Sequence, residues 1–171
     1  PGKSGAQLLA AIPGVGDDIG VEEVAQRPSV DMDFETLDLV GQRIDAQDRA
    51  DLAGVVVLHG TDTMEESAYY LDLTRTGGPP VVFTGAQRHA DQPGADGPAN
   101  IAAAVGAART EAIQAAGGTY VCFNGEVHAA RDVVKQHSWR VDAFGSPGKG
   151  PVGVLGPGGF EQYRELGTQT R

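Results

Sequence analysis

The chain has 171 residues, of which 40 % are hydrophobic and 21 % are charged, and this composition favours one globular domain over a disordered chain. Its formal net charge of −10 excludes nucleic acid and anionic membranes as expected partners, because both would be repelled. No apolar stretch of the sequence approaches the length of a membrane span, so no transmembrane helix is predicted.

The first part of the chain predicts two helices with a strand between them. Ser4-Gly5-Ala6-Gln7 is a capping-box pattern in front of an apolar stretch. Residues 21–25 form a short run that is typical of a strand. Asp33 can cap a helix whose apolar residues recur at helical spacing. These apolar residues are Phe34, Leu37, Val40 and Ile44.

Three continuous apolar runs follow, at residues 54–58, 80–84 and 119–124. Continuous runs, as opposed to alternating ones, are typical of parallel strands that are covered on both faces. Thr63 and Glu66 form a second capping box after the first run. Pro98 fits the first turn of a helix that Gly117 and Gly118 close. Because strands and helices alternate, we predict an α/β fold, a three-layer sandwich with a mostly parallel sheet.

The single cysteine, Cys122, lies inside the last of these runs. We expect it to be a small buried hydrophobic residue and not a nucleophile. One cysteine can build neither a disulfide framework nor a multi-cysteine metal site.

The pattern weakens after Asn124, and residues 126–137 leave strand and helix both open. From Gly145 on, the chain is rich in Gly and Pro, which predicts an extended connection. We therefore expect one domain over residues 1–150 and the start of a linker over residues 151–171. The chain begins with Pro1 and not with Met, so we expect a piece of a longer protein. Its compartment stays open between cytoplasmic and periplasmic or secreted.

Thr61 and Asp62 are the first candidates for chemistry, because they stand where a buried strand ends and a helix begins. Ligands of open α/β sheets bind at this end of the strands. Both residues could instead be ordinary helix caps. Since Thr63 and Glu66 already fill that role in the predicted capping box, the side chains of Thr61 and Asp62 are left for another purpose.

Lys135 is the candidate base. A lone lysine is usually a solvated surface charge, whereas the neighbouring Val133 and Val134 favour partial burial of this one. A Thr–Lys–Asp grouping would combine a hydroxyl nucleophile or water activator, a base and a carboxylate that orients the lysine.

Further segments can contribute to the same crevice. Residues 83–88 again follow a strand, and residues 95–99 open a helix, so they form either a wall of the crevice or a turn with a cap at Asp96. Ser29 or Asp31 could cap the helix that follows. The Ser29 hydroxyl could instead bind a substrate carboxylate.

The four histidines lack metal-ligand spacing, and no phosphate loop or dinucleotide fingerprint follows a strand. We therefore expect no metal and no cofactor.

Five segments in this order resemble the N-terminal domain of the bacterial-type L-asparaginase/glutaminase family. The string His59-Gly60-Thr61-Asp62-Thr63-Met64-Glu65-Glu66 is the most specific of them. The other four are Pro28-Ser29-Val30-Asp31-Met32, Phe83-Thr84-Gly85-Ala86, Ala95-Asp96-Gly97-Pro98-Ala99-Asn100 and Arg131-Asp132-Val133-Val134-Lys135.

The resemblance implies hydrolysis of the side-chain amide of L-asparagine, possible action on L-glutamine, no cofactor, and a homo-oligomer, a homotetramer, with sites shared between subunits. It implies that Thr61 is one of two catalytic threonines and that Lys135 and Asp62 complete its charge group. Asp62 would also hold the substrate α-ammonium. Ser29 and the backbone near Gly60 would hold the α-carboxylate, and Ala86 would offer a backbone contact near the scissile amide.

The chain departs from the family pattern in three respects. It has no match to the Thr-Gly-Gly-Thr-Ile-type turn that carries the other threonine, usually taken as the acylated nucleophile. It has no match to the C-terminal domain. Val30 stands where many relatives place Gln. We expect the absence of the first strand to leave an unpaired sheet edge, which favours aggregation.

Two alternatives belong to other functional classes. One is a catalytically silent module that keeps the amino-acid pocket and binds Asn or Asp without releasing ammonia. The other is a glutamine amidohydrolase subunit of a tRNA amidotransferase, although the acidic charge gives no sign of direct tRNA contact.

Overall fold

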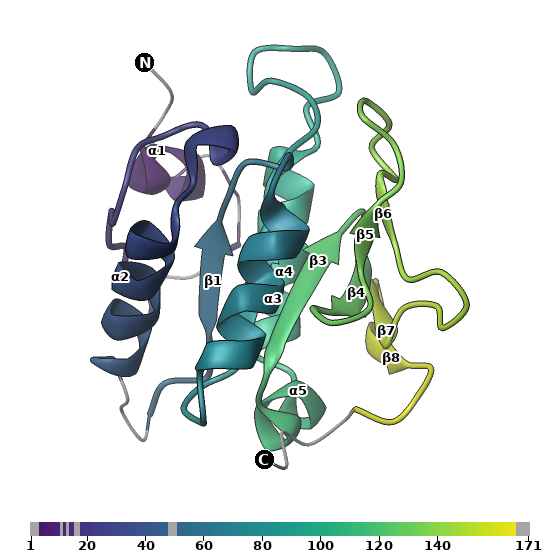
Figure 1. Ribbon diagram of the computed structural model, residues 1–171. Coiled ribbons are helices and arrows are strands. Elements are labelled where there is room, and N and C mark those ends of the chain that lie inside the picture. Colours follow the sequence, from purple (N-terminus) through teal and green to yellow (C-terminus); the bar gives the residue numbers. More distant parts are fainter. Residues whose placement is uncertain (1–3, 11, 13, 16–17, 48–50, 167–171) are drawn as a thin grey trace.

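The structure is a computed structural model that describes residues 4–10, 12, 14–15, 18–47 and 51–166. A mixed sheet lies between two layers of helices, with α3 in front of the sheet and α4 behind it (Figure 1). Its strands run in the order β1-β2-β3-β4-β7-β8. They are β1 (Val55–Leu58), β2 (Val81–Thr84), β3 (Thr119–Phe123), β4 (Glu126–Ala129), β7 (Gly153–Gly156) and β8 (Gly159–Gln162). The predicted α/β fold is confirmed.

The three continuous apolar runs form the parallel part of the sheet. In β1, β2 and β3 neighbouring strands pair in parallel, with Val57 opposite Phe83 and Phe83 opposite Val121. From β3 onward the pairs β3–β4, β4–β7 and β7–β8 are antiparallel. Within the described sheet β1 lies at one edge, as expected. Two short strands, β5 (Val134–Lys135) and β6 (Phe144–Gly145), form a separate antiparallel pair.

Alternate side chains of the parallel strands enter two different core layers. Val81, Phe83 and Val121 pack with Met64 and Leu71 on the side covered by α2 (Phe34–Asp45) and α3 (Met64–Thr74). Val82, Tyr120 and Cys122 pack on the other side, beneath α4 (Gly97–Ala108) and α5 (Glu111–Ala116). The short helix α1 (Gly5–Ala10) adds a third cluster against α4. Burial on both faces explains why these strands are apolar throughout.

Two predicted helix starts are confirmed by hydrogen bonds. At α1 the Ser4 N–H donates to Gln7 Oε1 at 2.9 Å, and the Gln7 N–H donates to Ser4 Oγ at 3.2 Å. At α2 the Asp33 carboxylate accepts from the Thr36 N–H at 2.8 Å. Pro98 lies in the first turn of α4 as expected.

The capping box predicted at Thr63 is wrong. Thr63 precedes α3, but its hydroxyl makes no capping hydrogen bond and instead donates to the Ser29 carbonyl at 2.6 Å. The hydroxyl therefore ties the β1–α3 loop to the 3-10 helix η1 (Ser29–Asp31). The hydroxyl thus donates to a distant carbonyl and does not accept from a backbone N–H of its own helix.

Three other expectations need correction. Residues 21–25 form no strand, since they are mostly exposed and have Glu22 and Glu23 at their centre. The helix expected to run from Pro98 to Gly117 breaks after Ala108, and α5 follows from Glu111. The extended connection expected after Gly145 is wrong for residues 153–162, which form the β7–β8 hairpin and extend the sheet through β4. Residues 126–137, left open above, contain β4 and β5.

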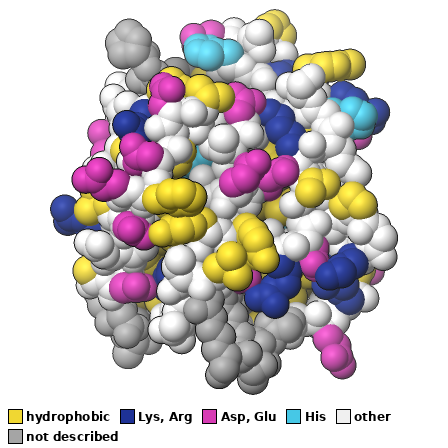
Figure 2. All heavy atoms as spheres, viewed as in Figure 1, with side chains coloured by type: hydrophobic (Ala, Val, Ile, Leu, Met, Phe, Trp, Pro, Cys, Tyr) yellow, Lys and Arg dark blue, Asp and Glu magenta, His cyan; other side chains and the backbone are white. Residues whose placement is uncertain are grey.

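Cys122 is fully buried, as expected, and burial raises the pKa of its thiol to about 12. In the part of the chain that the structure describes, none of the helices has the length and apolarity that crossing a membrane requires. On the face shown in Figure 2, acidic side chains are interspersed with basic ones over the molecule.

Candidate active site

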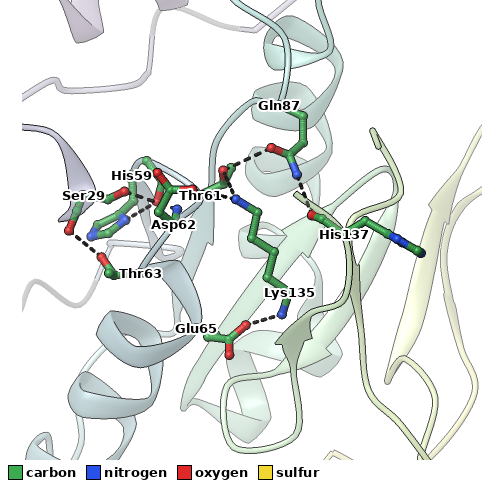
Figure 3. Close-up of polar contacts among 10 residues, drawn as sticks. Ser29, His59, Thr61, Asp62, Thr63, Glu65, Gln87, Lys135 and His137 are labelled. Carbon is green, nitrogen blue, oxygen red and sulfur yellow. Dashed lines mark hydrogen bonds and ion pairs between the residues drawn. The ribbon is translucent and has the colours of Figure 1, made fainter. Parts of the chain in front are cut away.

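The candidate site lies where the parallel strands end. Thr61 and Asp62 stand in the loop between β1 and α3, and Ala86 stands in the loop that follows β2. Because the carboxyl ends of adjacent parallel strands meet at one edge of a sheet, both loops reach the same place. The pair β5–β6 brings Lys135 to this edge from a distant part of the sequence (Figure 3).

Lys135 joins the two predicted residues of the β1–α3 loop. Its Nζ lies 2.8 Å from Thr61 Oγ1 and 2.8 Å from Asp62 Oδ1, and it donates a hydrogen bond to each. The Lys135 side chain is 14 % exposed and that of Asp62 is 62 % exposed. Thr61 is buried. A largely buried amine thus links a shielded hydroxyl to a carboxylate that faces solvent, which is where a soluble substrate would enter.

Glu65 fixes the backbone of Lys135. This glutamate stands in the first turn of α3, and its carboxylate accepts a hydrogen bond from the Lys135 N–H. Burial raises the pKa of the Glu65 carboxyl, while the bond from Lys135 opposes that rise. No local pattern points to this role of Glu65, because its partner lies 70 residues away along the chain.

Ser29 and Gly60 lie against each other beside this group. The Asp62 N–H donates to Ser29 Oγ at 3.2 Å, so Ser29 joins the loop that carries Thr61. A Cβ on Gly60 would lie 2.6 Å from Ser29 Oγ and 2.9 Å from Ser29 Cβ. Gly60 is therefore needed for close contact, and the buried Ser29 is held at the site.

The loop after β2 is held by carboxylate and amide side chains. Asp96 accepts from the Gln87 N–H at 3.0 Å and from the Arg88 N–H at 2.9 Å. Asn100 donates to the Gly85 carbonyl at 2.9 Å, which fixes the residue before Ala86. Asp96 stands at the N-cap position of α4, but its carboxylate makes no capping hydrogen bond to that helix. Its carboxylate instead holds the loop after β2, which forms a wall of the crevice.

The side chain of Gln87 reaches the centre of the group, although no motif in the sequence singles it out. Thr61 Oγ1 donates to Gln87 Oε1 at 3.2 Å, and Gln87 Nε2 donates to the His137 carbonyl at 3.3 Å. Figure 3 shows the side chains of Gln87 and Lys135 both reaching Thr61, Gln87 from above and Lys135 from below. The sequence signal that could have identified Gln87 is its position directly after Ala86, in the segment 83–88.

His59 was also not expected to contribute. Its Nδ1 lies 2.6 Å from the Gly60 carbonyl, so this nitrogen carries the hydrogen, and its ring packs edge-on against Phe83. Burial lowers the pKa of the imidazole. The ring therefore supports the turn at Gly60 through this hydrogen bond.

The structure thus places Ser29, Gly60, Thr61, Asp62 and Lys135 in one connected cluster, with Ala86 next to Gln87 in the adjoining loop. Over the described residues, no group of three or more His, Cys, Asp or Glu side chains is arranged to hold a metal ion. Hydroxyl, amine and carboxylate groups in this arrangement suit acyl chemistry on a small polar molecule.

Comparison with known proteins gives consistent matches over nearly the whole chain. A family model described as asparaginase, N-terminal, matches residues 1–166. A probable periplasmic L-asparaginase of Haemophilus influenzae is 39 % identical over 150 residues, which are 86 % of this chain and 42 % of that protein. L-asparaginase 2 of Escherichia coli is 38 % identical over 95 % of this chain and 47 % of its own length. A glutaminase-asparaginase of Pseudomonas fluorescens is 35 % identical over 92 % of this chain and 44 % of its own.

The fold matches solved structures as well. The crystal structure of a probable cytoplasmic L-asparaginase from Campylobacter jejuni gives a TM-score of 0.87 at 38 % identity, covering 93 % of this chain and 49 % of that one. The present chain therefore spans less than half the length of each of these relatives.

Proposed function

Since the chain belongs to the asparaginase family, we propose that the protein hydrolyses the side-chain amide of L-asparagine to L-aspartate and ammonia. The observation that supports this proposal best is the Lys135 amine, 2.8 Å from both Thr61 Oγ1 and Asp62 Oδ1. A hydroxyl beside an amine is a nucleophile with its base, and a carboxylate orients that base. No metal or cofactor is part of the proposal.

The family resemblance implies two catalytic threonines, and Thr61 is the one that this chain matches, so we assign the attack to it. In the proposed reaction, the Thr61 oxygen attacks the carbon of the side-chain amide while its proton passes to the neutral amine of Lys135. The carbon–nitrogen bond then breaks, and the leaving nitrogen takes the proton from Lys135 and departs as ammonia. Water hydrolyses the resulting ester, which releases L-aspartate and restores the Thr61 hydroxyl. Such positioned proton transfer contributes about 10²- to 10⁴-fold to the rate.

The remaining residues would recognise the amino-acid end of the substrate. A zwitterion needs a carboxylate for its ammonium and neutral donors for its carboxylate. The exposed Asp62 carboxylate fits the first need. The Ser29 hydroxyl and the backbone around Gly60 fit the second, and the backbone at Ala86 would contact the substrate near the scissile amide.

Assembly and compartment remain proposals of the same kind. We infer a homo-oligomer, with sites shared between subunits, from the family. The names of the relatives include both a periplasmic and a cytoplasmic protein, so they favour neither compartment for this one.

The proposal is tested by ammonia release from L-asparagine and L-glutamine, using the full-length protein and its Thr61→Val variant. Loss of activity of about 10²-fold or more in the variant, with L-aspartate still bound, is the expected result. Tight L-aspartate binding by the full-length protein without any ammonia release would replace hydrolysis by the silent binding module.

Glutamine is a second candidate substrate, favoured by the relatives named glutaminase-asparaginase. In that case the same assay shows ammonia from both amides. Release from glutamine alone would overturn the assignment of asparagine as the substrate.

A further inference from the structure

Gln87 is held between two parts of the candidate site that are far apart in the sequence. Its side-chain oxygen accepts from Thr61, and its side-chain nitrogen donates to the carbonyl of His137, two residues after Lys135. The side chain therefore spans from the β1–α3 loop to the segment that carries the amine (Figure 3). Nothing in its own loop requires this, because Asp96 already binds the Gln87 backbone.

The hydrogen-bonding groups fix which way the amide of Gln87 faces. The His137 carbonyl can only accept, so the NH₂ group of Gln87 must point to it. Oε1 is thereby turned towards Thr61, where it can only accept. The orientation follows from the network and needs no further assumption.

The same reasoning fixes the Thr61 hydroxyl. Lys135 donates to Thr61 Oγ1, so the hydroxyl hydrogen cannot point at the lysine in this state. Gln87 Oε1, at 3.2 Å, takes that hydrogen. Thr61 Oγ1 is thus held by one donor, Lys135, and one acceptor, Gln87.

We propose that Gln87 is a positioning residue that sets the direction of the Thr61 hydroxyl and its distance from Lys135. This inference rests on the proposed function for its consequence in catalysis. It makes Gln87 neither a base nor a nucleophile. While Lys135 donates to Thr61 Oγ1, the hydroxyl hydrogen stays directed at Gln87, and it can turn to Lys135 only once the amine is neutral.

The first variant is Gln87→Leu in the full-length protein, which removes both side-chain hydrogen bonds and keeps the backbone bond to Asp96. We expect kcat for L-asparagine to fall about 10- to 100-fold, as for a misplaced catalytic group. KM and the affinity for L-aspartate should change little. An equal loss in binding and kcat, or no loss in kcat, would overturn the proposal.

Gln92→Leu is the matched control. Gln92 lies in the same loop, and its side-chain oxygen accepts a local bond, from the His89 N–H at 3.1 Å. The control should keep the wild-type kcat and unfolding temperature. A fall in kcat equal to that of Gln87→Leu would mean that the loop as a whole, and not the Thr61 contact, is responsible.

Gln87→Glu tests through pH dependence whether position 87 acts on the Thr61–Lys135 pair. A carboxylate at this position adds a negative charge beside Lys135, next to the Asp62 and Glu65 carboxylates already there. It should hold the ammonium form more strongly, so the pH at which kcat reaches half its maximum should rise by about one unit or more. An unchanged midpoint contradicts the proposal.

A titration without turnover separates this inference from the proposed function. The ¹⁵N resonance of the Lys135 amine, followed by NMR through alkaline pH, should titrate at higher pH in Gln87→Glu than in the wild type. If the wild type releases no ammonia, the proposed function fails while this shift still decides the role of Gln87. If the wild type is active and the shift is absent, only the Gln87 inference fails.

Discussion

Asp62 is the most exposed member of the Thr61–Lys135–Asp62 group. In the proposed function its carboxylate binds the α-ammonium group of the substrate. Replacing it by Asn keeps the shape and removes the charge. Since a hydrogen bond to a charged group contributes about 1.5–3 kcal/mol, Asp62→Asn should weaken L-aspartate binding by about 10- to 100-fold. Isothermal titration calorimetry measures this directly.

Asp38→Asn is the control for that prediction. Asp38 is an exposed carboxylate on α2 that accepts from the Tyr70 hydroxyl at 2.7 Å, away from the site. It should leave the affinity for L-aspartate unchanged. Equal affinities for Asp62→Asn and wild type would remove Asp62 from the recognition of the ammonium group.

Glu65 gives the second prediction for a single residue. Its carboxylate holds the Lys135 N–H, so Glu65→Leu should displace the amine and lower kcat about 10- to 100-fold. Glu65→Gln keeps an acceptor and should retain most of the activity. Glu66→Leu, one residue further along the same turn, is the matched control. Steady-state kinetics measures these effects. Equal kcat values for Glu65→Gln and Glu65→Leu would contradict this account.

The sequence identified the catalytic candidates more easily than their supports. Thr61, Asp62 and Lys135 were found because their strings resemble a family motif and because Thr61 follows a buried strand. Glu65 and Gln87 were missed because their roles depend on partners 70 and 26 residues away, which no local pattern reveals. An amide or a carboxylate next to a motif residue is by itself compatible with a solvated surface.

Within single elements, the cap of α2 carries a pH-dependent prediction. Hydrogen bonds from the Thr36 side chain and backbone lower the pKa of the Asp33 carboxyl from 3.8 to about 2, with Arg27 contributing. A depressed pKa stabilises the fold above pH 3.8, and this contribution is lost as the pH falls through about 2. Asp33→Ala should therefore lower the unfolding temperature at neutral pH, and the difference from wild type should narrow as the pH approaches 2.

Thermal unfolding followed by circular dichroism at a series of pH values checks this prediction. Asp31→Ala, just before the helix, is the control and should give a smaller decrease at neutral pH. A constant difference between Asp33→Ala and wild type across the acid range would show that the charge of Asp33 does not support α2.

Predictions for the elements succeeded where the local pattern and the tertiary environment agree. The runs at 54–58, 80–84 and 119–124 are strands because each is covered on both faces by helices. The strand predicted at residues 21–25 does not form, because Glu22 and Glu23 are exposed and no neighbouring strand of the described chain pairs with them. The β7–β8 hairpin was missed because its Gly-rich sequence resembles a loop, and its register depends on β4, far back in the chain.

For the molecule as a whole, buried His128 predicts a loss of stability in acid. Burial, with a smaller contribution from nearby Arg164, lowers the pKa of this imidazole from 6.5 to about 4, and Nδ1 lies 3.0 Å from Ser146 Oγ. Between these two values the unfolded chain binds the proton and the folded chain does not. The free energy of unfolding should therefore decrease as the pH falls from 6.5 to 4, by up to about 3 kcal/mol.

Chemical denaturation at several pH values, in wild type and in His128→Gln, measures that slope. The variant should lose most of the decrease between pH 6.5 and 4, whatever its absolute stability. His89→Asn removes an exposed histidine and should keep the wild-type slope. An identical slope in His128→Gln would assign the acid sensitivity to other groups.

The central claim is that Thr61 and Lys135 act as one unit in amide hydrolysis, and a double-mutant cycle of ammonia release from L-asparagine tests it most directly. Thr61→Val and Lys135→Met should each reduce kcat by about 10²- to 10⁴-fold. Residues that act together are strongly non-additive, so the double variant should be no slower than the slower single variant. Losses that multiply, in variants that remain folded and bind L-aspartate, would contradict the account.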